Sequence, residues 1–150
     1  MGVDSTGGSH VISRLLSRDD KCTLRDAELA RYDRNIRRHL AAMNRRRLEK
    51  ITLRYFQYLA ALYAEIYLDR LFAHPKRLLA ELNRFVADRN GKRATVETPD
   101  PMFSVGDLQK LALWMATGSG KTLMMHLNYR QFLHYNTKPL DNVLLVTPNE

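Results

Sequence analysis

The first ninety residues carry apolar side chains at intervals of three and four, which is the spacing of an amphipathic helix. The spacing predicts three helices, over Leu24 to about Lys50, Ile51–Phe72 and Pro75–Asn90. In the second helix it predicts a buried stripe made of Phe56, Leu59, Tyr63 and Ile66. This part of the chain is therefore expected to be helical.

The pattern changes after Val105. Leu111–Met115 and Asn142–Thr147 are short, continuous apolar runs, as in strands that are buried on both faces of a parallel sheet. Between them, a glycine-containing turn precedes a helical pattern over Lys121–Tyr135. The predicted fold class is therefore α/β, with an N-terminal α-helical segment followed by the first βαβ unit of a parallel sheet. The sheet is expected to be incomplete, because two parallel strands cannot cover their own faces.

These patterns divide the chain into four parts. Residues 1–23 are predicted to be disordered or partly helical, and residues 24–90 to form a helical region. Residues 91–102 contain charges and a Pro-Asp-Pro run without any period, which is typical of a linker. Residues 103–150 are predicted to be the start of a second, truncated domain.

Positive charge is concentrated in the helical part. The chain of 150 residues has a formal net charge of +8, of which residues 1–100 carry +7 and residues 101–150 carry +1. A basic surface of this kind favours a polyanionic partner such as nucleic acid, or it is simply a solvated helix face. The triplet Arg45–Arg47 has the same two interpretations.

The remaining composition bears on the compartment. The single cysteine, Cys22, cannot form an internal disulfide, which fits a reducing cytoplasm, and no signal peptide is recognised at the N-terminus. The longest apolar stretch, Ile51–Phe72, contains four charged residues and is not expected to cross a membrane: Arg54, Glu65, Asp69 and Arg70.

The turn before the last helix carries the candidate chemistry. Its final residues, Gly120-Lys121-Thr122, match the end of a phosphate loop, although Met115 stands where a first glycine is usual. The predicted nucleotide-binding residues are Ala116, Thr117, Gly118, Ser119, Gly120, Lys121 and Thr122. The alternative interpretation is a flexible Gly-Ser-Gly turn before a helix.

Each residue type in this loop has a physical role. The two glycines let the backbone N–H groups approach phosphate oxygens, and the positive end of the following helix points at the same anion. Lys121 is a mobile point charge for the β- and γ-phosphates, and the Thr122 hydroxyl is a ligand for Mg²⁺. The predicted cofactors are therefore ATP and Mg²⁺.

The residues Leu113–Thr122 resemble motif I of superfamily-two DEAD/DEAH-box-like helicases, in the branch that contains the R subunits of type I and type III restriction enzymes. Val143–Glu150 resembles motif Ia of the same families. The resemblance implies a RecA-like ATPase domain that acts on nucleic acid, most plausibly DNA. It also implies that Thr147 and Pro148 lie near the nucleic-acid track.

A second resemblance lies upstream. The segment Arg54–Ala60 is similar to the Arg-x-aromatic-Gln-x-x-Ala pattern that precedes motif I in restriction-type helicases. By that resemblance Gln57 would read the adenine edge, since an amide both donates and accepts hydrogen bonds. A polar residue on a packed helix is the other interpretation. The family also suggests methylation and specificity subunits of a restriction system as partners.

ATP hydrolysis in such enzymes needs further residues. No Asp-Glu-x-His or Asp-Glu-x-Asp sequence follows the loop, and Asp141 and Glu150 are the only acids after it. The sequence is therefore expected to be the N-terminal part of an ATP-dependent DNA helicase or translocase, with little or no turnover of its own. Lys121 would stabilise the transition state only in the full enzyme.

Two other functions remain open at the level of sequence. A phosphate-loop enzyme of another class, such as a nucleotide kinase, usually carries glycine at position 115 and begins close to the loop. A non-enzymatic, basic, helical protein that binds nucleic acid or another partner would keep the phosphate loop only as a relic.

Overall fold

A computed structural model describes residues 24–93 and 98–144 of the chain. Within these ranges the elements are, in chain order, α2 (Asp26–Asn44), α3 (Tyr55–Ala73), α4 (Pro75–Asn90), the 3-10 helix η1 (Val105–Gln109) and α5 (Lys121–Tyr135). None of the described helices is both long and apolar enough to cross a lipid bilayer.

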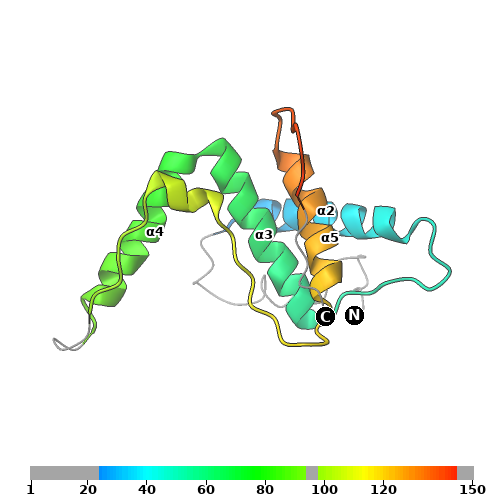
Figure 1. Ribbon diagram of the computed structural model, residues 1–150, viewed down its shortest axis with the longest axis horizontal. Coiled ribbons are helices and arrows are strands. Elements are labelled where there is room, and N and C mark those ends of the chain that lie inside the picture. The colour runs from blue at the N-terminus through cyan, green and yellow to red at the C-terminus, as the bar shows by residue number, and fades with distance from the viewer. Residues whose placement is uncertain (1–23, 94–97, 145–150) are drawn as a thin grey trace.

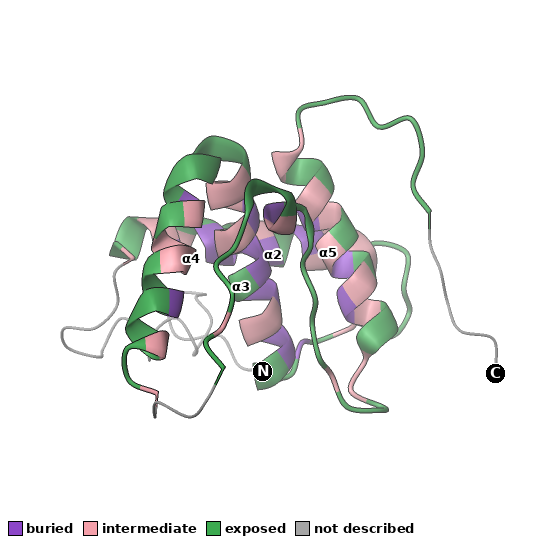
Figure 2. Cartoon of the chain, turned by 60° about the vertical axis from the view of Figure 1, so that its left-hand side comes forward, coloured by how far each residue is buried: buried purple, intermediate pink, exposed green. Residues whose placement is uncertain are grey.

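Helix α3 is the central element. It packs against α2, α4 and α5, and α2 and α5 also contact each other. The helices α2, α3 and α5 therefore form one three-helix unit, with α4 and η1 on the other side of α3 (Figure 1). The buried residues of α3 lie mainly where these neighbours cover it (Figure 2).

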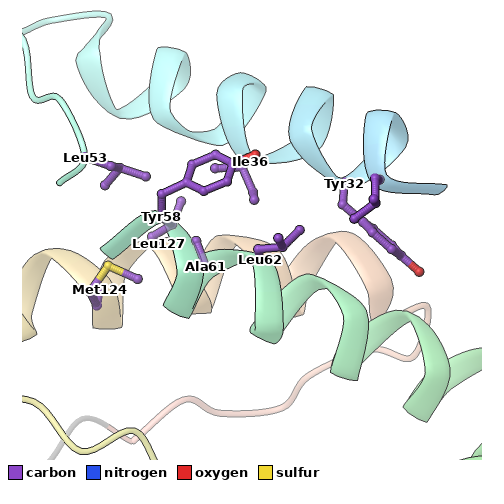
Figure 3. Packing of buried hydrophobic residues seen from close by; sticks show 9 residues of the cluster. Tyr32, Ile36, Leu53, Tyr58, Ala61, Leu62, Met124 and Leu127 are labelled. Carbon is purple, nitrogen blue, oxygen red and sulfur yellow. The ribbon is translucent and has the colours of Figure 1, made fainter. Parts of the chain in front are cut away.

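The core lies between α2, α3 and α5 (Figure 3). Leu29, Tyr32 and Ile36 recur at intervals of three and four and give α2 its apolar stripe. The partners of this stripe are Leu53, which precedes α3, with Tyr58, Ala61 and Leu62 of α3 and Met124 and Leu127 of α5. Burial of these side chains from water is the main force that holds the three helices together.

A buried polar cluster crosses the same interface. Glu65 of α3 is completely buried, and its carboxylate accepts hydrogen bonds from Gln131, Tyr135 and Asn35. Burial, reinforced by the bond to Glu65, raises the pKa of Tyr135, so its phenol stays protonated and donates. The cluster compensates the desolvation of one charge with donors from two other helices, α2 and α5.

The segment before α5 is attached to α4. The Asn83 side chain bonds both backbone groups of Phe103, and the Asn90 side chain does the same with Asp100. The Tyr67 hydroxyl donates to the Leu108 carbonyl oxygen at 2.8 Å. From η1 the chain then passes the beginning of α3 and enters α5 (Figure 1).

The predicted α/β fold with a βαβ unit is wrong, because residues 24–93 and 98–144 contain no strand. Leu111–Met115 forms no strand pairing, and Trp114 is 97% exposed. Leu144, in the second predicted strand, is 87% exposed, and residues 145–147 of that strand lie outside the described residues. A strand exists only when a neighbouring backbone accepts and donates its hydrogen bonds, and apolar composition alone does not supply that neighbour.

The helix predictions are mostly confirmed. Pro75–Asn90 and Lys121–Tyr135 have the predicted bounds, and the other two helices are shorter than predicted. The predicted buried stripe of α3 is wrong in detail, since Phe56 is exposed and Tyr63 is 66% exposed. Gln57 and Glu65 are buried instead, because α3 is covered from several sides. Their side chains form hydrogen bonds there, Gln57 with Ser119 and Glu65 with Gln131.

We expect Leu127→Ala to lower the free energy of unfolding by about 2–5 kcal/mol, since Leu127 is fully buried between three helices. Leu133→Ala removes the same atoms from an exposed position of the same helix and should cost less than about 1 kcal/mol. Urea unfolding followed by circular dichroism measures both. Equal losses in the two variants would contradict this assignment of the core.

Candidate nucleotide-binding site

The loop before α5 has the backbone conformation that its glycines allow. Gly118 and Gly120 have φ angles of 74° and 89°, in the left-handed region that residues other than glycine rarely adopt. A turn closes the loop, because Ser119 donates to the Ala116 carbonyl oxygen from both its N–H, at 3.2 Å, and its hydroxyl, at 2.6 Å. The chain then enters α5 directly, and the Met124 N–H makes the first helical bond to the Gly120 carbonyl oxygen.

The N-terminus of α5 presents unneutralised positive character. Gly120 is the N-cap, no side chain caps the helix, and its first turn contains no acidic residue. The first N–H groups of a helix have no partner within the helix, and together with the helix dipole they attract anions. Lys121 adds a full charge, and its ammonium donates to the Met115 and Ala116 carbonyl oxygens at 3.3 and 3.1 Å.

Gln57 lies directly against this loop. Its side-chain N–H donates to the Ser119 carbonyl oxygen at 2.7 Å, across 62 residues of sequence. Its amide oxygen accepts the Arg54 N–H at 2.8 Å, which satisfies the first turn of α3. The oxygen of this buried amide is therefore bonded at the beginning of α3, and its nitrogen is bonded to the loop before α5.

The contact between the two helix beginnings is close. A Cβ atom on Gly120 would lie 2.6 Å from Gln57 Nε2, whereas nothing lies within 4 Å of a Cβ on Gly118. Leu53, Tyr58 and Met124, which are close in sequence to the beginnings of these two helices, pack in the core (Figure 3). The glycine at 120 is thus required by its neighbour as well as by its φ angle.

The structure brings the predicted loop residues 116–122 together at the N-terminus of α5, on the exposed side of the molecule. It also brings Gln57 to this loop. Thr147 and Pro148 lie outside the described residues. The sequence did not predict that the Ser119 carbonyl oxygen accepts a hydrogen bond from Gln57, because a backbone acceptor does not depend on the residue type.

No group of three His, Cys, Asp or Glu side chains that could hold a metal ion occurs in the parts of the chain that the structure describes. Thr122, at the second position of α5, carries a hydroxyl, which has the chemistry of a Mg²⁺ ligand, as do the hydroxyls of Thr117 and Ser119 in the loop. A magnesium ion held there would take its other ligands from phosphate oxygens and water.

A left-handed glycine pair, a lysine and an uncapped helix beginning are features typical of anion-binding junctions of loop and helix. A family match described as "Type III restriction enzyme, res subunit" covers residues 71–150. The chain belongs to this family of type III restriction enzyme res subunits. No curated protein and no solved structure matches it.

Membership confirms the family resemblance inferred from the two motifs. At the level of the family, the function is ATP-dependent and of the helicase or restriction-enzyme type, with nucleic acid as the interaction partner. Members of the family generally use ATP and Mg²⁺. The match begins at residue 71, well upstream of the motif I segment, and so includes α4.

Replacing the loop glycines tests the contact with Gln57. Gly118→Ala should lower the free energy of unfolding by about 1–2 kcal/mol through its positive φ alone. Gly120→Ala should cost more, because the new Cβ collides with the Gln57 amide. In a Gln57→Ala background the difference between the two glycine variants should shrink. A difference that is the same in both backgrounds, measured by denaturant unfolding, would contradict the contact.

Proposed function

We propose that residues 116–122 bind the phosphates of ATP in an ATP-dependent protein that acts on DNA. The single observation that carries the proposal is the Gly118–Gly120 turn, which runs into an uncapped helix whose first residue is a lysine. Family membership supports the nucleotide and the nucleic acid together. It also favours the helicase type over the nucleotide-kinase alternative.

Binding would change the partners of Lys121. Its ammonium now donates to two loop carbonyl oxygens, which are weaker acceptors than a phosphate oxygen. In the proposed complex the ammonium leaves them for the β- and γ-phosphates, where it would stabilise charge during phosphoryl transfer. The Thr122 hydroxyl would bind Mg²⁺, and the loop N–H groups would donate to the remaining oxygens.

Gln57 would contribute by holding the loop. Its bond to Ser119 fixes the carbonyl side of the turn, which leaves the N–H groups of the following residues free for phosphate. For a contact with the adenine edge, as the family resemblance implies, Gln57 has its second amide N–H and the second acceptor site of its oxygen, since one of each is already used by Ser119 and Arg54. Gln57 is therefore proposed first as a positioning residue of the loop.

The DNA contacts proposed for Thr147 and Pro148 rest on the resemblance of their segment to motif Ia. Methylation and specificity subunits are proposed partners on the same ground. Turnover requires a carboxylate that orients water and holds Mg²⁺. The activity proposed for residues 116–122 is nucleotide binding.

Lys121→Ala should weaken the binding of a fluorescent ATP analogue in the presence of Mg²⁺ by at least about ten-fold, since it removes a charge-assisted contact to phosphate. Lys138→Ala, just beyond the other end of α5, removes an equal charge and should leave the affinity unchanged. Fluorescence titration measures both.

Unchanged affinity in Lys121→Ala would refute the assignment of the loop. An equal loss of affinity in both variants would also refute it, because it would indicate a general effect of positive charge.

A further inference from the structure

A groove lies between α2 and α5, away from the loop. It has a volume of about 470 Å³ and is open at the surface. Its lining residues are Arg38, His39 and Ala42 of α2 with His126, Tyr129, Arg130, Leu133 and His134 of α5. Along the axis of α5 these residues begin about 8 Å beyond Lys121 and end about 20 Å beyond it, so the groove is separate from the loop.

Every ionisable side chain on the groove wall is basic or, for Tyr129, a phenol. The wall contains two arginines and three histidines and no carboxylate. Glu65 of α3 lies behind the wall, 3.9 Å from His39 Nε2, but it is fully buried and its oxygens already accept three hydrogen bonds. No carboxylate lines the groove itself, so its exposed wall is basic.

The basic groups of the wall crowd one another. The Arg38 guanidinium contacts the two ring nitrogens of His134 at 3.1 and 3.4 Å, so two basic side chains lie against each other. Burial, together with the charges of Arg38, His134 and Arg130, lowers the pKa of His39 to about 4. The Nε–H of Arg130 is buried and has no hydrogen-bond partner. An anion in the groove would offset the mutual repulsion of these groups.

Tyr129 narrows the choice of anion. Its ring is 41% exposed at the edge of the groove, next to Arg130 in sequence and one turn from His126. A simple phosphate ion makes no use of an aromatic face. A nucleic-acid strand uses both features, because its backbone needs cations and its unpaired bases stack on aromatic rings.

We propose that the groove between α2 and α5 binds the phosphate backbone of a single nucleic-acid strand, with Tyr129 as a stacking platform for a base. The proposal rests on the proposed function, in which nucleic acid is the substrate. It adds a contact surface that lies outside the motif Ia segment. Arg38 and Arg130 bind phosphate oxygens, and the His134 ring lies beside them in contact with Arg38.

The test measures binding of a fluorescent oligothymidine to the 150-residue chain by anisotropy, over a range of salt concentrations. Every chain carries Lys121→Ala, so a failure of ATP binding by the loop does not affect the outcome. Arg38→Gln with Arg130→Gln should weaken binding at least about ten-fold and reduce the slope of log affinity against log salt by about 1.4, for two lost contacts. Lys76→Gln with Arg84→Gln removes two exposed charges from α4 and should change neither quantity appreciably.

Two further variants keep the test decisive. Arg38 and Tyr129 are exposed, so Arg38→Gln and Tyr129→Leu preserve the fold even if the loss of Arg130 does not. Arg38→Gln alone should reduce the slope by about 0.7. Tyr129→Leu should lower the affinity for the oligonucleotide at least about five-fold and leave the slope unchanged. Equal binding by all these variants and the α4 control would overturn the proposal.

A titration with inorganic phosphate distinguishes a site for a simple anion from a site for a nucleic-acid strand. Its binding is followed through the ring resonances of His126 and His134 by NMR. The proposal expects phosphate to bind weakly and to compete with the oligonucleotide, and Tyr129→Leu to affect only the oligonucleotide. Saturation by phosphate together with no effect of Tyr129→Leu on the oligonucleotide would mean a simple anion site and would refute the nucleic-acid assignment.

Discussion

The hydrogen bond from the Gln57 amide to the Ser119 carbonyl oxygen joins the beginnings of α3 and α5, and the arrangement of the loop depends on it. A glycine-containing turn on the surface has no fixed shape of its own, because glycine has the largest conformational freedom of any residue. Here one end of the turn continues into α5 and the other is held by a buried side chain of α3. The N–H groups that would meet a phosphate are thereby given a direction before any ligand arrives.

This bond needs a rigid base, which the packing of the three helices supplies. Leu53 and Tyr58 near the beginning of α3 contact the same core as Met124 and Leu127 of α5. At the other end of the interface the buried Glu65 accepts from Gln131 and Tyr135 of α5. The two helices are therefore fixed at both ends, by apolar packing near the loop and by a polar cluster farther along.

Much of the local structure could be predicted from the sequence, and the rest depends on contacts between distant segments. Pro75 and Gly120 mark the beginnings of α4 and α5 through local chemistry, so both helices have their predicted bounds. The strand over Leu111–Met115 was predicted from apolar composition, but a strand requires a paired neighbour. The loop was identified by its residue types, whereas the partnership of Gln57 with Ser119 and the grouping of Arg38 with His134 join separate helices and appear only in three dimensions.

The central claim is that the loop held by Gln57 receives the phosphates of a nucleotide, and NMR on the isotope-labelled chain tests it most directly. As ATP and Mg²⁺ are added, the backbone N–H signals of Gly118, Gly120 and Lys121 should move together and saturate, because these groups form the phosphate contacts. The side-chain amide signals of Gln57 should move at the same concentrations, because that amide holds the loop. Signals that stay in place at these residues while ATP binds elsewhere on the chain would contradict the account.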